Sequence, residues 1–205
     1  MRKKKTIQIL IQIIFLILFL LFIINNKVQL WMGIFIFSIA ASFLLGRIYC
    51  GWICPINTLM KVVTWLKKKL HIKSFQIPKF LDKPWIRLLF LGIFILFFIF
   101  TMISGKKLPI LPAILVLGVI LTFFFPEELW HYFLCPYGTI LSLSGSKAKH
   151  YMRIDTEKCN NCSACKRVCP AKAIEKKEKH HITKKDCLVC MKCEENCKQH
   201  AISYK

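Results

Sequence analysis

The sequence predicts an α-helical membrane protein with four transmembrane helices, followed by a small C-terminal α+β domain. Of the 205 residues, 56 % are hydrophobic and 17 are Phe, and the apolar residues gather in four stretches before residue 126. This composition is high in apolar residues for a soluble domain. Eight of the cysteines fall in two short runs after residue 150. We therefore expect a membrane domain over residues 1–150 and a cysteine-rich domain over residues 151–205.

Each apolar stretch is long enough to cross a bilayer, because about 17 to 25 apolar residues in a helix span the hydrocarbon core. The stretches are Thr6 to Ile24, Val28 to Gly46, Trp85 to Ser104 and Leu108 to Phe125. The first follows a basic segment, as in a secretory signal. It exceeds the roughly 7 to 15 residues of a signal core and ends in Asn25-Asn26-Lys27, so we expect a retained anchor.

The positive charge predicts the orientation of these helices. The net charge is +21, and the 31 Lys and Arg residues lie mostly on one side of the predicted spans. Residues 1–5 carry 4 of them, 47–83 carry 8 and 126–205 carry 15, whereas the opposite turns carry only Lys27, Lys106 and Lys107. An excess of Lys and Arg marks the cytoplasmic side. We expect both termini and the cysteine-rich domain to be cytoplasmic.

Nucleic acid is not an expected partner of this basic chain. The positive charge lies beside the spans, where anionic lipid also attracts it, and no nucleic-acid motif accompanies it.

The eight clustered cysteines form two copies of one spacing, Cys-x2-Cys-x2-Cys-x3-Cys. The copies start at Cys159 and Cys187, and Pro170 follows the first. This spacing is typical of bacterial proteins with two [4Fe–4S] clusters, in which the fourth cysteine of each run ligates the other cluster. It predicts Cys159, Cys162, Cys165 and Cys197 as ligands of cluster 1, and Cys187, Cys190, Cys193 and Cys169 as ligands of cluster 2.

Structural zinc and disulfides are the alternatives. Zinc ribbons pair two short knuckles across a longer gap, whereas each run here has four cysteines within eleven residues. Disulfides need an oxidising compartment. An internal repeat favours the two-cluster prediction, because Ile154, Cys159 and Ile174 recur at the same spacing as Ile182, Cys187 and Ile202. The domain is too small for a stable core of its own, so we expect cluster ligation to supply much of its folding free energy.

Three cysteines remain, and each lies where a predicted span leaves the bilayer. Cys50 and Cys54 follow the second span, and Cys135 follows the fourth; Cys54 and Cys135 both precede a proline. Residues i and i+4 are neighbours on a helix, so we expect Cys50 to lie beside Cys54, and His131 beside Cys135. Together they offer three thiols and one imidazole, a set suited to zinc or iron. The alternative is that the cysteines are small buried hydrophobes.

At this point the chain resembles a known family. The run Gly46-Arg-Ile-Tyr-Cys-Gly-Trp-Ile-Cys-Pro55, the run Cys135-Pro-Tyr-Gly138 and the trailing cysteine repeat are similar to the membrane iron–sulfur proteins of the NapH/MauN type, the membrane components of quinol dehydrogenases. Related architectures occur in electron donors of nitrous-oxide reduction and in accessory proteins of cytochrome oxidase assembly.

The resemblance implies four membrane helices in a prokaryotic cytoplasmic membrane, two interfacial Cys-x3-Cys-Pro motifs, and electron flow between quinol and the clusters. Cys50 and Cys54 match the first motif, and Cys135 matches the second cysteine of the second motif. His131 stands where the family has a cysteine, which leaves metal binding open for the second motif but removes its thiol pair.

Other polar residues have simpler expectations. Gln8 and Gln12 in the first span, and Ser38 and Ser42 in the second, suit hydrogen bonds between helices. Arg87 is expected to snorkel to the interface, and His180-His181 to be solvated. The Lys61 to Lys83 loop is an amphipathic surface segment or a dock for an acidic partner.

No motif for hydride transfer, acyl transfer, nucleotide hydrolysis or covalent haem is present. We therefore predict an electron relay between the quinone pool and a redox protein. Two alternatives stay open. One is a metal reductase or assembly factor that uses Cys50, Cys54, His131 and Cys135. The other is a ferredoxin tethered to the membrane without quinone chemistry.

Overall fold

A computed structural model describes residues 2–104 and 110–205. Contacts divide the chain into two compact units, Met1–Pro55 with Ile140–Lys205 and, separately, Ile56–Thr139. This division differs from the boundary predicted at residue 150, because the cysteine-rich segment packs on the first two helices and on the turn that follows them. The Lys106-Lys107 pair and the start of the fourth predicted span, at Leu108, lie outside the described residues.

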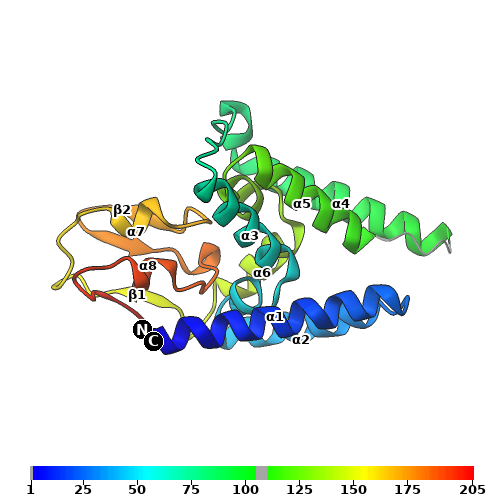
Figure 1. Ribbon diagram of the computed structural model, residues 1–205, viewed down its shortest axis with the longest axis horizontal. Helices are drawn as coiled ribbons and strands as arrows, with labels where there is room; N and C mark the ends of the chain where they lie inside the picture. Colours follow the sequence, from blue (N-terminus) through cyan, green and yellow to red (C-terminus); the bar gives the residue numbers. More distant parts are fainter. Residues whose placement is uncertain (1, 105–109) are drawn as a thin grey trace. The chain divides into compact units, whose positions relative to one another are not determined.

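The first unit begins with two helices, α1 (Arg2–Ile24) and α2 (Leu30–Leu45), which run side by side (Figure 1). Trp31 of α2 is 1 % exposed, and its ring meets Phe15, Phe19 and Phe22 of α1 edge to face, with 4.9 Å between the centroids of Trp31 and Phe19. The indole Nε1 donates a hydrogen bond of 2.8 Å to the Tyr49 hydroxyl. Aromatic packing thus holds the hairpin together, and the hydrogen bond joins α2 to the turn that follows it.

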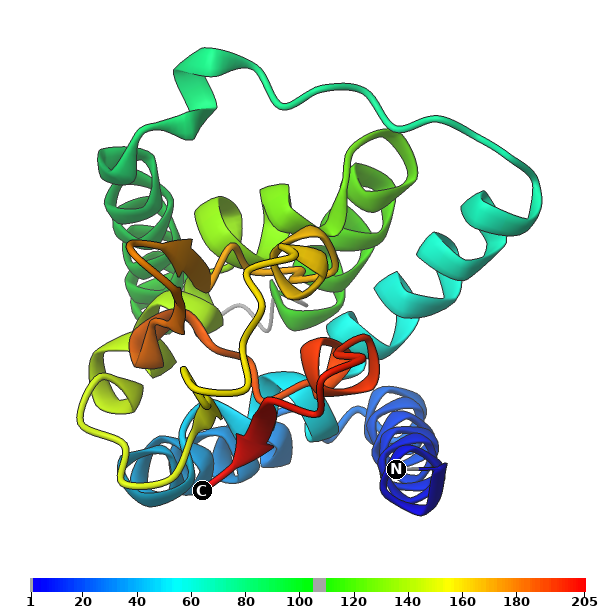
Figure 2. The ribbon, with the colours of Figure 1, turned by 90° about the vertical axis from the view of Figure 1, so that its left-hand side faces the viewer.

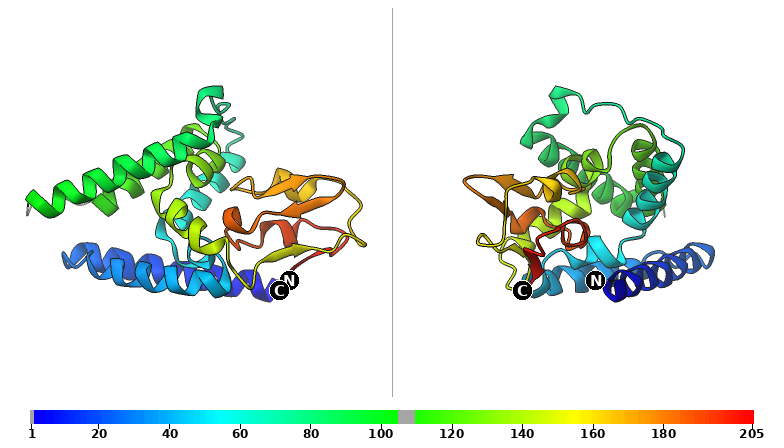
Figure 3. Two further views of the ribbon diagram at one scale, coloured as in Figure 1. Left: turned by 180° about the vertical axis from the view of Figure 1, so that it is seen from behind. Right: turned by 60° about the vertical axis from the view of Figure 1, so that its left-hand side comes forward.

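A short π-helix, η1 (Tyr49–Ile53), follows α2. In the second unit, α3 (Pro55–Lys69) precedes the short 3₁₀-helix η2 (Lys79–Asp82), and α4 (Pro84–Ser104) lies beside α5 (Ile110–Phe124), as Figure 3 shows from behind. A second π-helix, η3 (Leu129–Leu134), packs on α4 and α5, and α6 (Pro136–Gly145) leads back to the first unit. Prolines begin α3, α4 and α6, where a missing N–H costs nothing.

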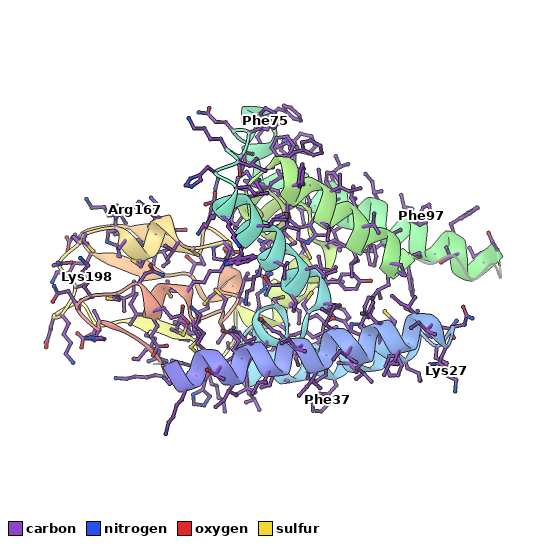
Figure 4. All side chains as sticks on the ribbon, in the orientation of Figure 1. Lys27, Phe37, Phe75, Phe97, Arg167 and Lys198 are labelled. Atoms are coloured by element: carbon purple, nitrogen blue, oxygen red, sulfur yellow. The ribbon has the colours of Figure 1, made fainter. Side chains whose placement is uncertain are left out.

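The helices coincide with the four predicted spans, but their lengths differ from expectation. Among the described residues, one apolar helix, Lys3–Ile24, is long enough by itself to cross a membrane. The other apolar helices, Leu30–Leu45, Trp85–Thr101 and Ile110–Phe124, are 17 residues or shorter. Four crossings therefore stay a prediction. Large apolar side chains are nevertheless exposed on these helices, among them Phe37 at 74 % and Phe97 at 50 % (Figure 4).

The cysteine-rich segment forms two small antiparallel sheets. Strand β1 (Met152–Ile154) pairs with β4 (Ile202–Tyr204), and β2 (Ile174–Lys176) pairs with β3 (His180–Ile182). Each half has one short helix, α7 (Ala164–Arg167) or α8 (Lys192–Glu195), and the 3₁₀-helix η4 (Lys184–Asp186) precedes the second run. Figure 2 views this segment from its outer side.

The two halves of this segment repeat one backbone when the two cysteine runs are aligned. Strand β1 corresponds to β3, β2 to β4, and α7 to α8. Positive φ angles recur in the same way, at Asn161, Ser163 and Lys172 in the first half and at Val189, Met191 and His200 in the second. The left-handed conformation is costly for residues other than glycine. Its recurrence at matched positions shows that both cysteine loops need the same turns.

Candidate functional site

The cysteines of the two runs surround two separate cavities in the first unit. One cavity is lined by Cys169, Cys187, Cys190 and Cys193, together with apolar side chains such as Ile174 and Ile182. The other is lined by Cys159, Cys162, Cys165 and Cys197. Each cavity thus brings together the four cysteines that the spacing assigns to one cluster, and their ligation of clusters stays a prediction. None of the eleven cysteines forms a disulfide.

Burial makes these thiols reluctant to ionise. It raises the pKa of Cys187 to about 12, and it also raises the pKa of Cys193 and of Cys165. A thiolate in such surroundings needs a cation close by, and metal binding releases the thiol proton. Four convergent thiols in an apolar cavity therefore fit an iron–sulfur cluster, which accepts and releases one electron at a time when bound.

Backbone N–H groups point at the fourth cysteine of each run. The amide of Ala173 donates to Cys169 Sγ over 3.3 Å, and the amide of Ala201, its counterpart in the second half, donates to Cys197 Sγ over 3.4 Å. Hydrogen bonds to ligand sulfurs are one of the factors that set cluster potentials. Both halves therefore provide the same support to the thiol that crosses over to the other cavity.

The two cavities differ in their exposure to solvent. Cys187 and Cys193 are buried, whereas Cys162 is exposed. The sequences of the two matched loops differ in a way that fits this difference in exposure. The first has Asn160, which is exposed, and Asn161, which is half-buried, where the second has Leu188 and Val189, which are fully buried. We call these segments, Cys159–Cys162 and Cys187–Cys190, the first and second cysteine loops.

The second cysteine loop is covered by the turn that follows α2. At Gly51, a Cβ atom would lie 2.3 Å from the carbonyl oxygen of Leu188 and 3.1 Å from that of Val189. Real Cβ atoms do not approach backbone that closely. Trp52 Nε1 donates to the carbonyl of Val189 over 3.0 Å. The contact is backbone against backbone, so only glycine fits at residue 51.

Two glutamines of α1 complete this contact. The side-chain nitrogen of Gln8 donates to Gly51 O over 2.9 Å and to Cys190 O over 3.4 Å, and that of Gln12 donates to Gly51 O over 2.6 Å. Both glutamines are 5 % exposed. The expected hydrogen bonds between helices are therefore present, because both glutamines of α1 donate to a carbonyl of the π-helix η1. Of the two serines, Ser38 bonds to the carbonyl of Ile34 in its own helix, and Ser42 bonds to Ser144.

Arg47 links the first motif to the second cysteine loop. This side chain is 1 % exposed, and Nη1 donates to the carbonyls of Lys185 and Asp186 over 3.2 and 3.4 Å. Its Nη2 donates a hydrogen bond to Cys50 Sγ over 3.8 Å. A buried guanidinium is costly unless its donors are used. Arg47 thus binds Cys50 and the segment before Cys187 at once, a role that the sequence did not reveal.

Cys54 and Cys135 occupy equivalent places in the two π-helical turns. The amide of Cys54 donates to Tyr49 O, and the amide of Cys135 donates to Trp130 O, each over 2.9 Å. Each cysteine has an extended backbone and precedes the proline that begins the next helix. We expected an α-helical turn; the structure has the wider π turn, a rare form that often occurs at functional sites. Cys50 and Cys54 belong to one unit, and His131 and Cys135 to the other.

Arg87 is another candidate functional residue, and its contacts differ from those that the sequence predicts. It is half-buried rather than extended to the surface, and Nε donates to Thr139 Oγ1 over 3.2 Å. Nη2 donates to Gly138 O over 3.4 Å, and the guanidinium lies 5.8 Å from the ring centre of Tyr132. Arg87 therefore supports the Cys135 motif. The signal in the sequence was a single charge within an apolar stretch.

A buried amide follows the first motif. Asn57 is 1 % exposed, and neither side-chain atom has a hydrogen-bond partner among the described residues. The buried indole nitrogen of Trp130 also lacks an acceptor there. The Trp130 ring and Ile56, which precedes Asn57, pack against the same residue, Gly118. Unsatisfied buried polar atoms are rare and call for an unseen partner.

Two further expectations need correction. His180 is 1 % exposed rather than solvated, and its ring nitrogens contact Asn161 Oδ1 at 2.8 Å and Ser163 Oγ at 3.1 Å. Burial, and then nearby Lys176 and Lys166, lower the pKa of its imidazole. His180 therefore supports the first cysteine loop.

Lys67 also differs from expectation, because its side chain does not lie along the surface segment that the sequence predicts. Its Nζ donates to Thr122 O over 2.9 Å and to Ser74 Oγ over 2.8 Å. Burial lowers the pKa of this ammonium, although Glu127 opposes the shift. It therefore satisfies carbonyls at the end of α5, as cations commonly do. The aromatic residues of this loop, Trp65, Phe75 and Phe80, are exposed.

Across the described residues, no three His, Cys, Asp or Glu side chains form a compact site for a single metal ion. The eight cysteines instead line the two cavities described above, four to each cavity. The fold and these cavities define a ferredoxin-type electron-transfer protein that binds 4Fe–4S clusters.

Comparisons with known proteins agree with this class. A family model described as "4Fe-4S binding domain" matches residues 28–73 and 108–151, and a second with the same description matches residues 152–175. The two parts of the first match are the segments that contain the two π-helical motifs. No solved structure matches the chain.

Relatives identify the family. An uncharacterized protein of Methanocaldococcus jannaschii is 30 % identical over 191 residues, which cover 89 % of this chain and 74 % of that protein. The ferredoxin-type protein NapH of Haemophilus influenzae is 29 % identical over 78 % of this chain and 62 % of its own length. The methylamine utilization ferredoxin-type protein MauN of Methylobacillus flagellatus is 31 % identical over 61 % and 48 %. The chain belongs to the NapH/MauN-type 4Fe–4S ferredoxin family.

The close contact at Gly51 generates a first prediction. Gly51→Ala should separate η1 from the second cysteine loop and destabilise the first unit by about 1 to 3 kcal/mol, as overpacking does. We expect a lower thermal midpoint and an altered electron paramagnetic resonance signal from one cluster only. Gly33→Ala is the matched control, because nothing lies within 4 Å of the Cβ added there. Equal stability of the two variants would contradict the contact.

The cysteine groups generate a second prediction. Cys162→Ser should remove one of two cluster signals and lower the iron content from roughly eight to roughly four atoms per chain, since each cluster holds four irons. Cys50→Ser, outside both groups, should leave both signals in place. Two intact signals in the Cys162→Ser protein would refute the grouping.

Proposed function

We propose that this chain is a membrane-bound electron relay that passes electrons between the quinol pool and a redox protein through two [4Fe–4S] clusters. The contact of the Tyr49–Ile53 turn with the second cysteine loop carries this proposal, because it joins a cysteine-lined cavity to the apolar hairpin of α1 and α2. In this function Cys159, Cys162, Cys165 and Cys197 hold cluster 1, and Cys187, Cys190, Cys193 and Cys169 hold cluster 2.

The membrane location is part of the proposal. It is supported by the 22-residue apolar helix Lys3–Ile24 and by the large apolar side chains that face outward on α2, α4 and α5. A soluble protein rarely exposes so many. The bias of Lys and Arg then places both termini and the clusters in the cytoplasm, where thiols stay reduced. α2 and α5, which are shorter than a typical span, would cross with the help of the adjoining turns or a locally thinner bilayer.

Asn57 supports a quinone in the membrane part. Its amide offers one donor group and one acceptor, both buried and both lacking a partner among the described residues. A quinol hydroxyl or quinone carbonyl would satisfy such a group, as small polar anchors do in otherwise apolar pockets. Oxidation of one quinol releases two electrons and two protons, and two one-electron centres can take the electrons in sequence while water accepts the protons.

A second candidate function is metal handling by Cys50, Cys54, His131 and Cys135. It is favoured by the family match over residues 28–73 and 108–151, which is itself described as 4Fe–4S binding. Metal content distinguishes the two functions. The relay predicts roughly eight irons per chain, whereas metal handling at the motifs predicts bound metal in addition to these eight irons.

The relay is tested by adding a menaquinol analogue to the anaerobically purified protein and following the clusters by electron paramagnetic resonance. We expect quinol to reduce the clusters, and the Cys50→Ser/Cys54→Ser protein to be reduced more slowly with both clusters assembled. If intact clusters do not respond to quinol, the chain is a metal-handling protein or a simple tether.

Asn57 generates a third prediction. Asn57→Leu removes the proposed partner of the quinone oxygen, and a lost buried hydrogen bond of this kind costs about 1 to 3 kcal/mol. Quinol-dependent cluster reduction should therefore slow at least about fivefold, with cluster signals and dithionite reduction unchanged. Asn25→Leu, the same change in an exposed turn, is the control. Equal rates in both variants would exclude Asn57 from the quinone site.

A further inference from the structure

We propose that the exposed basic face beside Cys162, formed by Lys166 and Arg167 of α7, is the docking surface for an acidic electron-carrier protein. This inference rests on the proposed function and adds to it the partner's chemistry and the cluster through which the partner is served. It comes from comparing the two halves of the cysteine-rich segment, which have the same backbone but opposite surroundings.

The matched position in the second half is already occupied by this chain. Residues Glu194 and Glu195 of α8 correspond to Lys166 and Arg167 when the two cysteine runs are aligned. Lys4 Nζ lies 3.1 Å from Glu194 Oε1, and Lys5 Nζ lies 2.9 Å from Glu195 Oε2. The basic start of α1 thus docks on the acidic helix of the second half.

The first half has the inverse charge at this position. Lys166 and Arg167 are both exposed, and no described carboxylate forms an ion pair with either one. Arg167 Nη1 donates to the carbonyl of Cys162, over 3.4 Å. In Figure 4, Lys198 lies at the left end of the cysteine-rich segment, and Arg167 lies on its upper side, away from α1. A complementary partner at the matched position would be acidic.

The same comparison indicates which cluster serves the partner. The second cysteine loop is covered by Gly51, Trp52 and Gln8, so it has no room for another protein. The first cysteine loop has polar Asn160 and Asn161 in place of Leu188 and Val189, and Cys162 is the one exposed cysteine of the chain. One electron would pass between this chain and the carrier on the side of Cys162. One of the two proteins is oxidised by this electron transfer, and the other is reduced.

The orientation excludes a lipid surface as the occupant. The apolar parts of α1 and α2 extend away from this end of the first unit, with Lys27 at the opposite end (Figure 4). Membrane-bound helices would therefore hold the Arg167 face toward the aqueous phase. A soluble acidic protein fits this position, because complementary charge steers association and sets its salt dependence.

Flavodoxin, an acidic one-electron carrier protein, serves as the probe, with the full-length protein in detergent. Its dissociation constant is measured at low ionic strength for the wild type, Lys166→Glu/Arg167→Glu and the control Lys147→Glu/Lys149→Glu. The control residues are exposed and undergo the same change in charge. We expect the Lys166/Arg167 variant to bind about tenfold more weakly, the control to stay within about twofold, and high salt to remove the difference.

Zero-length coupling of amines to carboxylates supplies a second readout. Lys166 should be a preferred site of cross-linking to flavodoxin in the wild type. Equal weakening of the two variants, or cross-links spread evenly over the basic loops, would overturn the proposal. Neither measurement uses quinol, so the docking surface can fail while the quinol relay stands, and the reverse. Intact cluster signals in each variant show that it is folded.

Discussion

The structure of the first unit depends on the close approach of two backbones at Gly51. The carbonyl of Leu188 occupies the space where any side chain at residue 51 would begin. Gln8 and Gln12 satisfy the carbonyl of Gly51 itself, which would otherwise be buried without a donor in an apolar bundle. The hairpin of α1 and α2 and the cysteine-rich segment consequently belong to one compact unit. Their union gives the second cavity its burial and leaves the first exposed.

Because of this contact, the two matching halves of the cysteine-rich segment have different environments. The turns, strands and short helices of the two halves match, including the unusual positive φ angles. The side chains diverge where the surroundings differ. Leu188 and Val189 are buried against the turn that follows α2, while Asn160 is exposed and Asn161 is half-buried. Two matching groups of four cysteines thus differ in their access to solvent, which suits the proposed relay between two partners.

The cysteine groups and the helix positions could be predicted because they depend on local spacing and composition. The spacing predicts that Cys197 joins the first run, with which it lines one cavity, and the apolar stretches predict the positions of α1, α2, α4 and α5. The positions of Arg47, Arg87, Lys67 and His180 could not be predicted. Their partners include groups as far as 139 residues away in the sequence, among them backbone carbonyls that no periodic pattern marks. The π turns were also missed, because their wider hydrogen-bonded turns depend on packing against neighbouring helices rather than on propensity.

The central claim is that the two clusters have unequal access to solvent. It is tested most directly by electron paramagnetic resonance of the reduced protein with and without an added dysprosium chelate, which speeds the spin relaxation of solvent-accessible centres. The signal that disappears in Cys162→Ser should relax much faster when the chelate is present, while the other signal should hardly change. Equal enhancement of both signals would mean that the hairpin does not cover the second cysteine loop, and it would contradict the asymmetric relay.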